Sequence, residues 1–229
     1  MRLKTILLII YFSLLIETVK SETIHQWEVY TISLKSSGNY TNPYKEIPVT
    51  KDGDLVSVTF MGTGGDALNK EIKVIGFWIG GSEWRVNFAP PLSGNWRYTT
   101  YSRDKSMNGK KGNFEVVAWS REEKDANAVR NGLIKVKKDG KMAGHFFEYT
   151  DGQPVLWIGD TWWNWTDRRI HLESFKQLVD DRSAKGFNIG QLFVPGNGWS
   201  RESSLLDNTY SILDTEHAAK VEEMISIKD

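Results

Sequence analysis

The spacing of hydrophobic residues changes near residue 120, and this change constrains the fold more strongly than any other feature of the chain. Before residue 120, short runs alternate apolar with polar residues, which is typical of strands with one face on a core and one in water. After it, compact apolar runs alternate with segments of helical spacing, which indicates strands separated by helices. The sequence therefore predicts a multidomain chain, with an all-β sandwich followed by an α/β unit.

The first unit contains runs of about six to eight residues that have the character of strands. These runs are residues 27–34, 55–61, 72–78, 83–89, 95–102 and 113–119. Turn residues separate them, as in Lys51–Asp54 and Pro90–Gly94. About seven short strands in about a hundred residues, with no helical window, favour a two-sheet sandwich of immunoglobulin type over residues 22–120. Trp84 and Trp96 lie on the apolar side of the alternation, so we expect both in its core.

The two units are joined by a short polar stretch. Residues 121–130 are charged and show no periodicity, so they are predicted to be a linker. Two strand-like runs, 133–137 and 145–149, then lie on either side of Asp139-Gly140, a dipeptide typical of hairpin turns. We therefore expect a β-hairpin at the start of the second unit.

The remainder of the second unit alternates strands with helices. Residues 154–159 form a nearly continuous apolar run, which is typical of a strand buried on both faces. Helical spacing follows over 170–185 and ends at a glycine, as helices commonly do. A second apolar strand, 187–194, and a second helix, 215–227, complete the pattern. This order predicts that residues 131–229 are a truncated N-terminal fragment of a TIM-type (β/α)8 barrel.

The N-terminus has the pattern of a secretory signal peptide over residues 1–21. Arg2 and Lys4 precede an apolar run, Ile6–Ile16, that is too short to span a bilayer. Ser21 ends a segment suited to cleavage. We therefore expect an exported protein, in a bacterial periplasm or outside the cell, with no stable membrane insertion after cleavage. The absence of cysteine, and hence of disulfides, fits a bacterial product better than a eukaryotic one.

Composition excludes several partners and cofactors. The 29 basic residues balance the 29 acidic ones, so the surplus of positive charge that a nucleic-acid-binding protein needs is missing. Without cysteine there is no thiolate zinc site, and the four histidines lack the spacing of metal ligands. The sequence therefore predicts no nucleic-acid partner, no cofactor and no metal.

The candidate binding site lies in two loops that follow the predicted parallel strands, because barrel sites form at the carboxyl ends of strands. These loops, Gly159–Trp165 and Pro195–Trp199, hold four of the ten tryptophans. Flat indole rings cover the apolar C–H faces of sugars, while Asp and Asn side chains bind their hydroxyls. We therefore predict carbohydrate-binding roles for Asp160, Trp162, Trp163, Asn164, Trp165, Asn197 and Trp199. The alternative is structural: the tryptophans pack over the barrel or against the sandwich, and Asp160 caps the following segment.

Five motifs of the first unit stand together: Asn42–Tyr44, Gly76–Gly81, Trp84–Pro90, Gly94–Tyr98 and Gly112–Val116. With them the unit resembles an uncharacterised immunoglobulin-like domain found at the N-terminus of exported bacterial glycoside hydrolases. The second unit has the motifs Phe147–Tyr149, Asp151–Pro154, Trp157–Trp163 and Ala184–Asn188. With these it resembles the start of an apiosidase-like (β/α)8 glycosidase. Together these resemblances imply the breakdown of plant or microbial polysaccharide, and they leave the sugar open.

The sequence departs from this family in one respect. The resemblance implies catalytic carboxylates at the ends of the fourth and seventh barrel strands, whereas this chain stops after the second strand and its helix. A complete barrel typically needs about 250 residues, far more than residues 131–229 provide. Glu202 and Asp207, in the second loop, have no evident partner. We therefore assign no catalytic residue and expect the chain to be inactive alone.

Three explanations of the short second unit stay open. The remaining barrel portion belongs to a longer version of the gene, it belongs to a neighbouring chain of a split enzyme, or the gene is truncated. The alternative function is a non-catalytic carbohydrate-binding or cell-surface adhesion module, with the sandwich as the working unit. In either case the sandwich, which can close its own core, is predicted to be the more stable unit.

Overall fold

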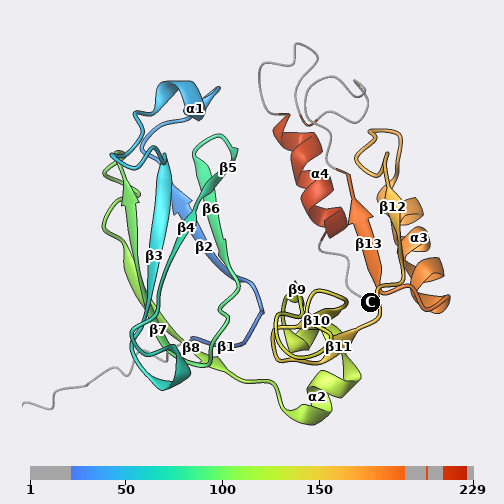
Figure 1. Ribbon diagram of the computed structural model, residues 1–229. Helices are drawn as coiled ribbons and strands as arrows, with labels where there is room; N and C mark the ends of the chain where they lie inside the picture. The colour runs from blue at the N-terminus through green and yellow to red at the C-terminus, as the bar shows by residue number, and fades with distance from the viewer. Residues whose placement is uncertain (1–21, 194–204, 206–213, 226–229) are drawn as a thin grey trace, which may run out of the picture.

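The computed structural model describes residues 22–193, 205 and 214–225 of the chain. Strands dominate it, and they form two units that lie side by side (Figure 1). The helices are α1 (Pro43–Glu46), α2 (Arg121–Ala126), α3 (Leu172–Ala184) and α4 (Thr215–Ile225), with short 3-10 turns at Gly65–Ala67 and Ala128–Asn131. None of the helices in the described ranges combines the length and apolar character needed to cross a membrane.

The first unit consists of two β-sheets that face each other. One sheet has the order β1 (Glu22–His25), β8 (Lys111–Val117), β7 (Gly94–Ser102), β3 (Val56–Gly62) and β4 (Glu71–Ile75). The other has the order β2 (Tyr30–Lys35), β6 (Glu83–Phe88) and β5 (Phe77–Gly80). All neighbours pair antiparallel except β1 and β8, which are parallel. The predicted β-rich first unit is confirmed, while its immunoglobulin type stays a prediction.

Aromatic side chains from both sheets fill the core between them. Trp84 of β6 and Trp96 of β7 are fully buried, as the alternation predicts. Phe60 stacks on Phe88 of the opposite sheet with ring centroids 4.0 Å apart, and its edge contacts Phe114. Each such ring contributes about 1.5–3 kcal/mol when it leaves water. The first unit therefore holds a continuous hydrophobic core of its own.

The predicted strand 72–78 divides at Gly76 and belongs to both sheets. Residues before Gly76 form β4, which pairs with β3, and residues after it form β5, which pairs with β6. The Gly76 amide donates to the Val56 carbonyl over 2.9 Å. A side chain at this position would clash with the Val56 methyl group, so the chain can cross between sheets here only because the residue is glycine.

The predicted linker is helical rather than irregular. Ser120 accepts a hydrogen bond from the Glu123 amide at 3.2 Å, and the Glu123 carboxylate accepts one from the Ser120 amide at 2.8 Å. This reciprocal pair is a capping box, and it starts α2. The Ser-x-x-Glu pattern was visible in the sequence. Apolar periodicity could not reveal the helix, because α2 buries none of its residues.

The second unit combines a small antiparallel sheet with a parallel pair of strands. The antiparallel sheet has the order β11 (Pro154–Val155), β10 (Phe147–Tyr149) and β9 (Ile134–Val136), as the hairpin signature predicts. β12 (Gly159–Trp162) then pairs parallel with β13 (Ile189–Leu192), and α3 connects them. The predicted order of strand, helix, strand and helix is present. The strands of the described residues do not close a barrel, so the barrel stays a prediction.

The prediction of a doubly buried strand over 154–159 is wrong. Leu156, Trp157 and Ile158 expose 73%, 45% and 41% of their surface. They lie between β11 and β12 and belong to neither ladder. The Asn188 side chain binds their backbone instead, accepting from the Ile158 amide at 2.9 Å and donating to the Leu156 carbonyl at 2.7 Å. An apolar run fixes neither pairing nor burial, because both depend on which elements reach it.

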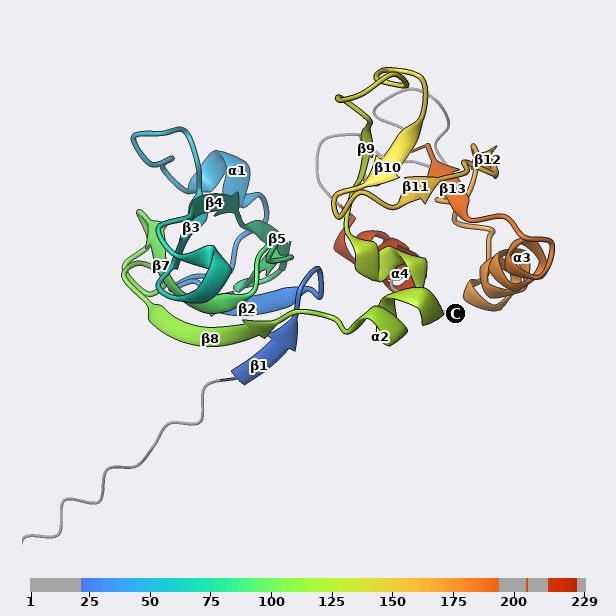
Figure 2. The same cartoon turned by 60° about the horizontal axis from the view of Figure 1, so that its bottom comes forward.

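The two units meet at α4 and at Trp119, which lies just before α2. α4 lies between the β2-β6-β5 sheet of the first unit and β13 of the second (Figures 1 and 2). Arg85 of β6 pairs with Glu222 of α4 at 2.8 Å. At the other contact, the Trp119 and His25 rings stack with their centroids 3.8 Å apart. The Arg130 guanidinium lies 4.3 Å from the centroid of the Trp119 ring. The second unit thus approaches the outer face of the β2-β6-β5 sheet.

Candidate functional site

β12 and the loop that follows it carry the described candidates: Asp160 and Trp162 lie in the strand, and Trp163, Asn164 and Trp165 follow it. The Trp162 indole N–H donates to one oxygen of the Asp160 carboxylate, and Arg182 Nε donates to the other at 2.8 Å. Hydrogen bonding to Asp160 raises the pKa of Arg182 above its already high ordinary value. Both oxygens of Asp160 therefore have partners within the chain, and the carboxylate joins β12 to α3.

Trp165 does not have the role predicted for it. Its side chain is 3% exposed, and its indole N–H donates to the Phe193 carbonyl at 2.8 Å. The ring packs near Phe175 of α3, with centroids 6.0 Å apart. It belongs to a small core between α3 and α4, so a sugar cannot stack on it. The structural alternative, in which a loop tryptophan packs within the unit, is the correct one here.

The other described candidates lie nearer the surface. Trp162 is half-buried, and its ring meets Phe175 edge to face at 5.5 Å. Trp163 is 52% exposed, with its ring centroid 5.3 Å from that of Phe193. Asn164 is exposed, and its carbonyl accepts from the Asp167 amide. Trp163 and Asn164 together form an exposed aromatic and amide pair of the kind that suits a sugar. The carbohydrate roles of these residues stay predictions.

Two predicted residues, Asn197 and Trp199, lie outside the described residues.

The sequence did not single out the residues that fix this loop in place. Asp167 is buried and accepts from the Arg169 amide and guanidinium at 2.8 to 2.9 Å, and these hydrogen bonds lower its pKa. Arg168 pairs with Asp214, the residue before α4, at 2.8 Å. The Lys220 ammonium of α4 donates to the Arg168 carbonyl at 3.2 Å. The available sequence signal is the Asp-Arg-Arg run that begins two residues after Trp165.

The described loop carries out binding chemistry more readily than acid–base chemistry. Asp160 of β12 and Asp167 of the loop each accept hydrogen bonds from an arginine. The hydrogen bonds from Arg169 lower the pKa of Asp167, so this carboxyl group is a poor proton donor. Glycoside hydrolysis needs a second carboxyl group opposite the first, about 5–9.5 Å away. We therefore assign no catalytic residue in this loop. Within the described ranges, no three His, Asp or Glu side chains gather in a way that could hold a metal ion.

Comparison with protein families divides the chain in the same way as its fold. Residues 23–103 match the model of the Domain of unknown function (DUF5060). Residues 141–223 match the model of the apiosidase-like catalytic domain. The first match lies within the sandwich, and the second begins just before β10 and ends within α4. Each of the two resemblances carried by the sequence motifs is thus supported by a family match.

A solved structure shares the fold. The crystal structure of a protein from Bacteroides vulgatus ATCC 8482, provisionally described as a glycoside hydrolase, superposes with a TM-score of 0.60 at 22% identity. The match covers 90% of this chain and 39% of that one, so this chain spans well under half the length of its structural relative. No curated protein sequence matches this chain.

Proposed function

We propose that this chain is the N-terminal portion of an exported bacterial glycoside hydrolase that acts on plant or microbial polysaccharide. The observation that carries the proposal is the exposed pair of Trp163 and Asn164. This pair follows a parallel strand, in a segment that matches an apiosidase-like catalytic domain. In this proposal the loop contacts a sugar ring, with the indole against its C–H face and the amide near its hydroxyls.

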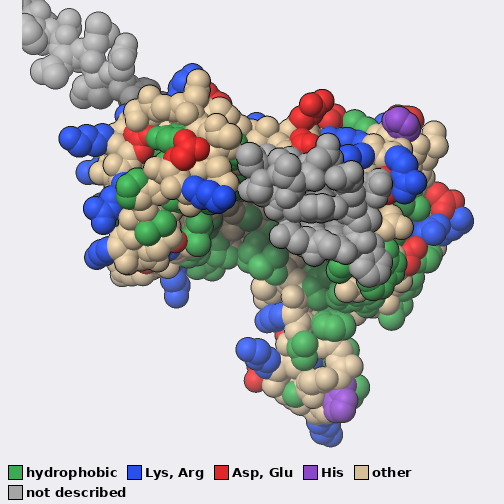
Figure 3. All heavy atoms as spheres, turned by 90° about the horizontal axis from the view of Figure 1, so that it is seen from above, with side chains coloured by type: hydrophobic (Ala, Val, Ile, Leu, Met, Phe, Trp, Pro, Cys, Tyr) green, Lys and Arg blue, Asp and Glu red, His purple; other side chains and the backbone are tan. Residues whose placement is uncertain are grey.

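The catalytic carboxylates come, in this proposal, from further βα units that continue the parallel sheet of β12 and β13. The exposed apolar run Leu156–Ile158 supports this, because soluble proteins rarely leave large contiguous apolar surface in water. Figure 3 shows hydrophobic side chains gathered on the second unit. The added units would belong to the same gene product or to a neighbouring chain. The chain alone then binds glycan without cleaving it.

Export is a further part of the proposal. It rests on the signal-peptide pattern of residues 1–21. Detection of the chain in the periplasm or medium, with residues 1–21 removed by cleavage after Ser21, would support it. Retention of residues 1–21 on a cytoplasmic product would contradict it.

The experiment that tests the function measures glycan binding and cleavage by the purified chain. Affinity electrophoresis would use gels that contain xylan, mixed-linkage β-glucan, arabinogalactan or polygalacturonate. We expect retardation by at least one polysaccharide, weaker retardation of the Trp163→Ala variant, and no release of reducing sugar. Adding the downstream barrel segment should restore hydrolysis. Hydrolysis by the chain alone would contradict its inactivity, and a completed barrel that cleaves no glycan would overturn the hydrolase assignment.

A further inference from the structure

The outer face of the five-stranded sheet carries one aromatic side chain where the strand alternation calls for a polar one. In β7, Trp96, Tyr98 and Thr100 point toward the core, and the residues between them point outward. Tyr101 therefore shares the outward face and is 46% exposed. A tyrosine ring left on a polar sheet face contributes nothing to the sandwich core, so its presence there calls for another explanation.

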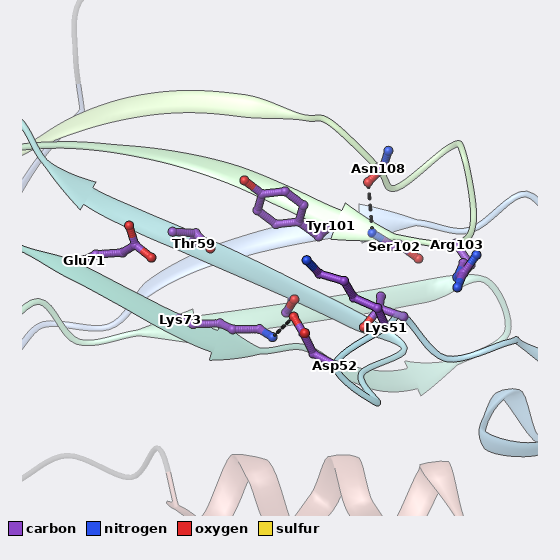
Figure 4. Close-up of a pocket in the computed structure, with 11 residues that line it drawn as sticks. Lys51, Asp52, Thr59, Glu71, Lys73, Tyr101, Ser102, Arg103 and Asn108 are labelled. Atoms are coloured by element: carbon purple, nitrogen blue, oxygen red, sulfur yellow. Dashed lines mark hydrogen bonds and ion pairs between the residues drawn. The ribbon is translucent and has the colours of Figure 1, made fainter.

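Tyr101 lies in a groove of about 540 Å³ that crosses strands β4, β3 and β7 (Figure 4). The β-sheet register brings Tyr101 opposite Ser57, and Thr59 opposite Lys73. Small hydroxyl side chains on β3 thus line the groove between the Tyr101 ring and the charged residues of β4. Figure 4 shows the Lys51 side chain extending from its loop toward Tyr101.

The charges around the groove are of both signs and partly cancel. The Lys73 ammonium lies 2.6 Å from Asp54 and 2.9 Å from Asp52, and hydrogen bonds to these two carboxylates raise its pKa. Glu71 lies on the same strand, two residues away, and also lines the groove. The groove therefore offers hydrogen-bond donors and acceptors without a strong net field.

This groove is open to solvent, because the second unit approaches the other sheet. α4 contacts β5 and pairs with Arg85 of β6, and both strands belong to the β2-β6-β5 sheet of the first unit. The groove belongs to the opposite sheet and is separated by the core from the loop that holds Trp163. A ligand could occupy both places at once.

The chemistry of the groove fits a carbohydrate better than other macromolecules. A nucleic acid needs a surplus of positive charge, and here Lys73 already pairs with acidic residues. A protein interface needs an apolar centre, and Tyr101 is the one large apolar ring among the lining residues. A single exposed ring surrounded by hydroxyl, carboxylate and ammonium groups matches one sugar face and its rim of hydroxyls.

We propose that this groove binds an oligosaccharide, with one sugar ring stacked on Tyr101 and the hydroxyls of that ring and of neighbouring sugar units bound by Lys51, Thr59 and Glu71. The inference rests on the proposed action on polysaccharide and adds a second contact to it. The sandwich would hold a polysaccharide chain while the loop after β12 contacts the same polymer elsewhere. Two linked contacts raise the overall affinity, because the second binding step becomes intramolecular.

The test compares four variants of the full chain in affinity gels that contain xylan, mixed-linkage β-glucan, arabinogalactan or polygalacturonate. Tyr101→Ala removes the ring, whereas Tyr101→Phe keeps it. Tyr44→Ala removes a tyrosine of similar exposure from α1, away from the groove, and Trp163→Ala removes the ring from the other unit. We expect Tyr101→Ala to weaken binding about tenfold, which corresponds to the loss of about 1.4 kcal/mol. Tyr101→Phe and Tyr44→Ala should bind within about threefold of the parent chain.

Thermal unfolding shows whether each variant is folded. Because the Tyr101 ring is exposed, its removal should leave the unfolding temperature unchanged. Equal binding by Tyr101→Ala and the parent, or no binding to any polysaccharide, would overturn the groove. Binding lost in Trp163→Ala but intact in Tyr101→Ala would overturn the groove and leave the proposed hydrolase standing. Binding that depends on Tyr101, in a completed barrel that cleaves no glycan, would support the groove and overturn the hydrolase.

Discussion

Arg182 of α3 donates from Nε to a carboxylate oxygen of Asp160 over 2.8 Å, and this contact joins β12 to the helix that follows it. Arg182 shares its helix face with Phe175, so a charged side chain lies on the stripe that packs against the sheet. Its charge is balanced there by Asp160 and, at 2.6 Å, by Asp181 of the same helix. We expect Arg182→Ala to loosen β12, and hydrogen exchange of the amides in residues 159–162 should become several-fold faster.

Lys185→Ala is the matched control for Arg182→Ala. Lys185 lies one turn further along, pairs with Asp181 at 2.6 Å, and is exposed. Pairs of this kind contribute little because water and salt screen them. Exchange in β12 should therefore be unchanged in Lys185→Ala. Equal acceleration in both variants would show that the contact between Asp160 and Arg182 has no special structural role.

Gly76→Ala should destabilise the sandwich by about 1–3 kcal/mol, because the added methyl group clashes with Val56 where the chain changes sheets. Urea unfolding followed by tryptophan fluorescence measures the loss. Gly38→Ala is the control, since a methyl group there meets Tyr40 at an ordinary contact distance of 3.7 Å. Unchanged stability in Gly76→Ala would mean that the crossing between sheets does not depend on a close backbone approach.

Asp104 organises a loop of the sandwich and should make its stability depend on acid pH. Burial alone would raise the pKa of the Asp104 carboxyl, but hydrogen bonds from Ser106 and Ser37 outweigh it and lower the pKa from 3.8 to about 2. The folded state thus favours the ionised form. Its contribution, about 2 kcal/mol, is complete above pH 4 and is lost as the pH falls toward 2.

Asp104→Asn tests this contribution, since asparagine keeps the shape and loses the charge. Urea unfolding should show the variant to be less stable than the parent at pH 7, and the difference should shrink at pH 3. Asp52→Asn is a control, because Asp52 is exposed and pairs with a lysine on the surface. A difference between the parent and Asp104→Asn that stays constant from pH 7 to pH 3 would contradict the lowered pKa.

Two neighbouring tryptophans of the candidate loop should respond in opposite ways to substitution. Trp165→Ala removes a buried ring from the core between α3 and α4 and should cost about 3–5 kcal/mol, enough to unfold the second unit. Trp163→Ala removes an exposed ring and should leave unfolding nearly unchanged while weakening glycan binding. Circular dichroism and affinity electrophoresis separate these effects. Loss of structure in Trp163→Ala would make its role structural instead.

Local patterns predicted the elements of the chain better than the relations between them. Alternation located the strands of the sandwich and the buried positions of Trp84 and Trp96, because burial there follows directly from the pleat of a strand. Helical spacing located α3 and α4 within a few residues. The change of sheet at Gly76 was not predictable from spacing, since it depends on how closely Val56 of a distant strand approaches.

The candidate site shows the same limit. Tryptophans 162, 163 and 165 look alike in the sequence, and only the packing of α3 and α4 separates a buried ring from an exposed one. The strand of Tyr101 is predicted over residues 95–102, but Tyr101 is not among the predicted site residues. Extending the alternation to the end of β7 places this aromatic ring on the polar face.

His217 of α4 should make the second unit less stable as the pH falls below neutrality. Its side chain is buried, and burial, with the nearby positive charge of Arg168, lowers its pKa below the ordinary 6.5. The folded state therefore favours the neutral imidazole, so stability is complete above about pH 6.5 and is lost as the pH falls and the unfolded chain takes up a proton. The partner carboxylate Asp214, whose pKa is itself lowered, stays ionised throughout this range and does not add to the change.

His217→Gln tests this pH dependence, because glutamine does not titrate. In the parent, hydrogen exchange of the α4 amides should accelerate between pH 7.5 and 5.5 beyond the intrinsic effect of pH. In the variant this additional acceleration should be absent. The same pH dependence in both proteins would show that His217 is not the group responsible.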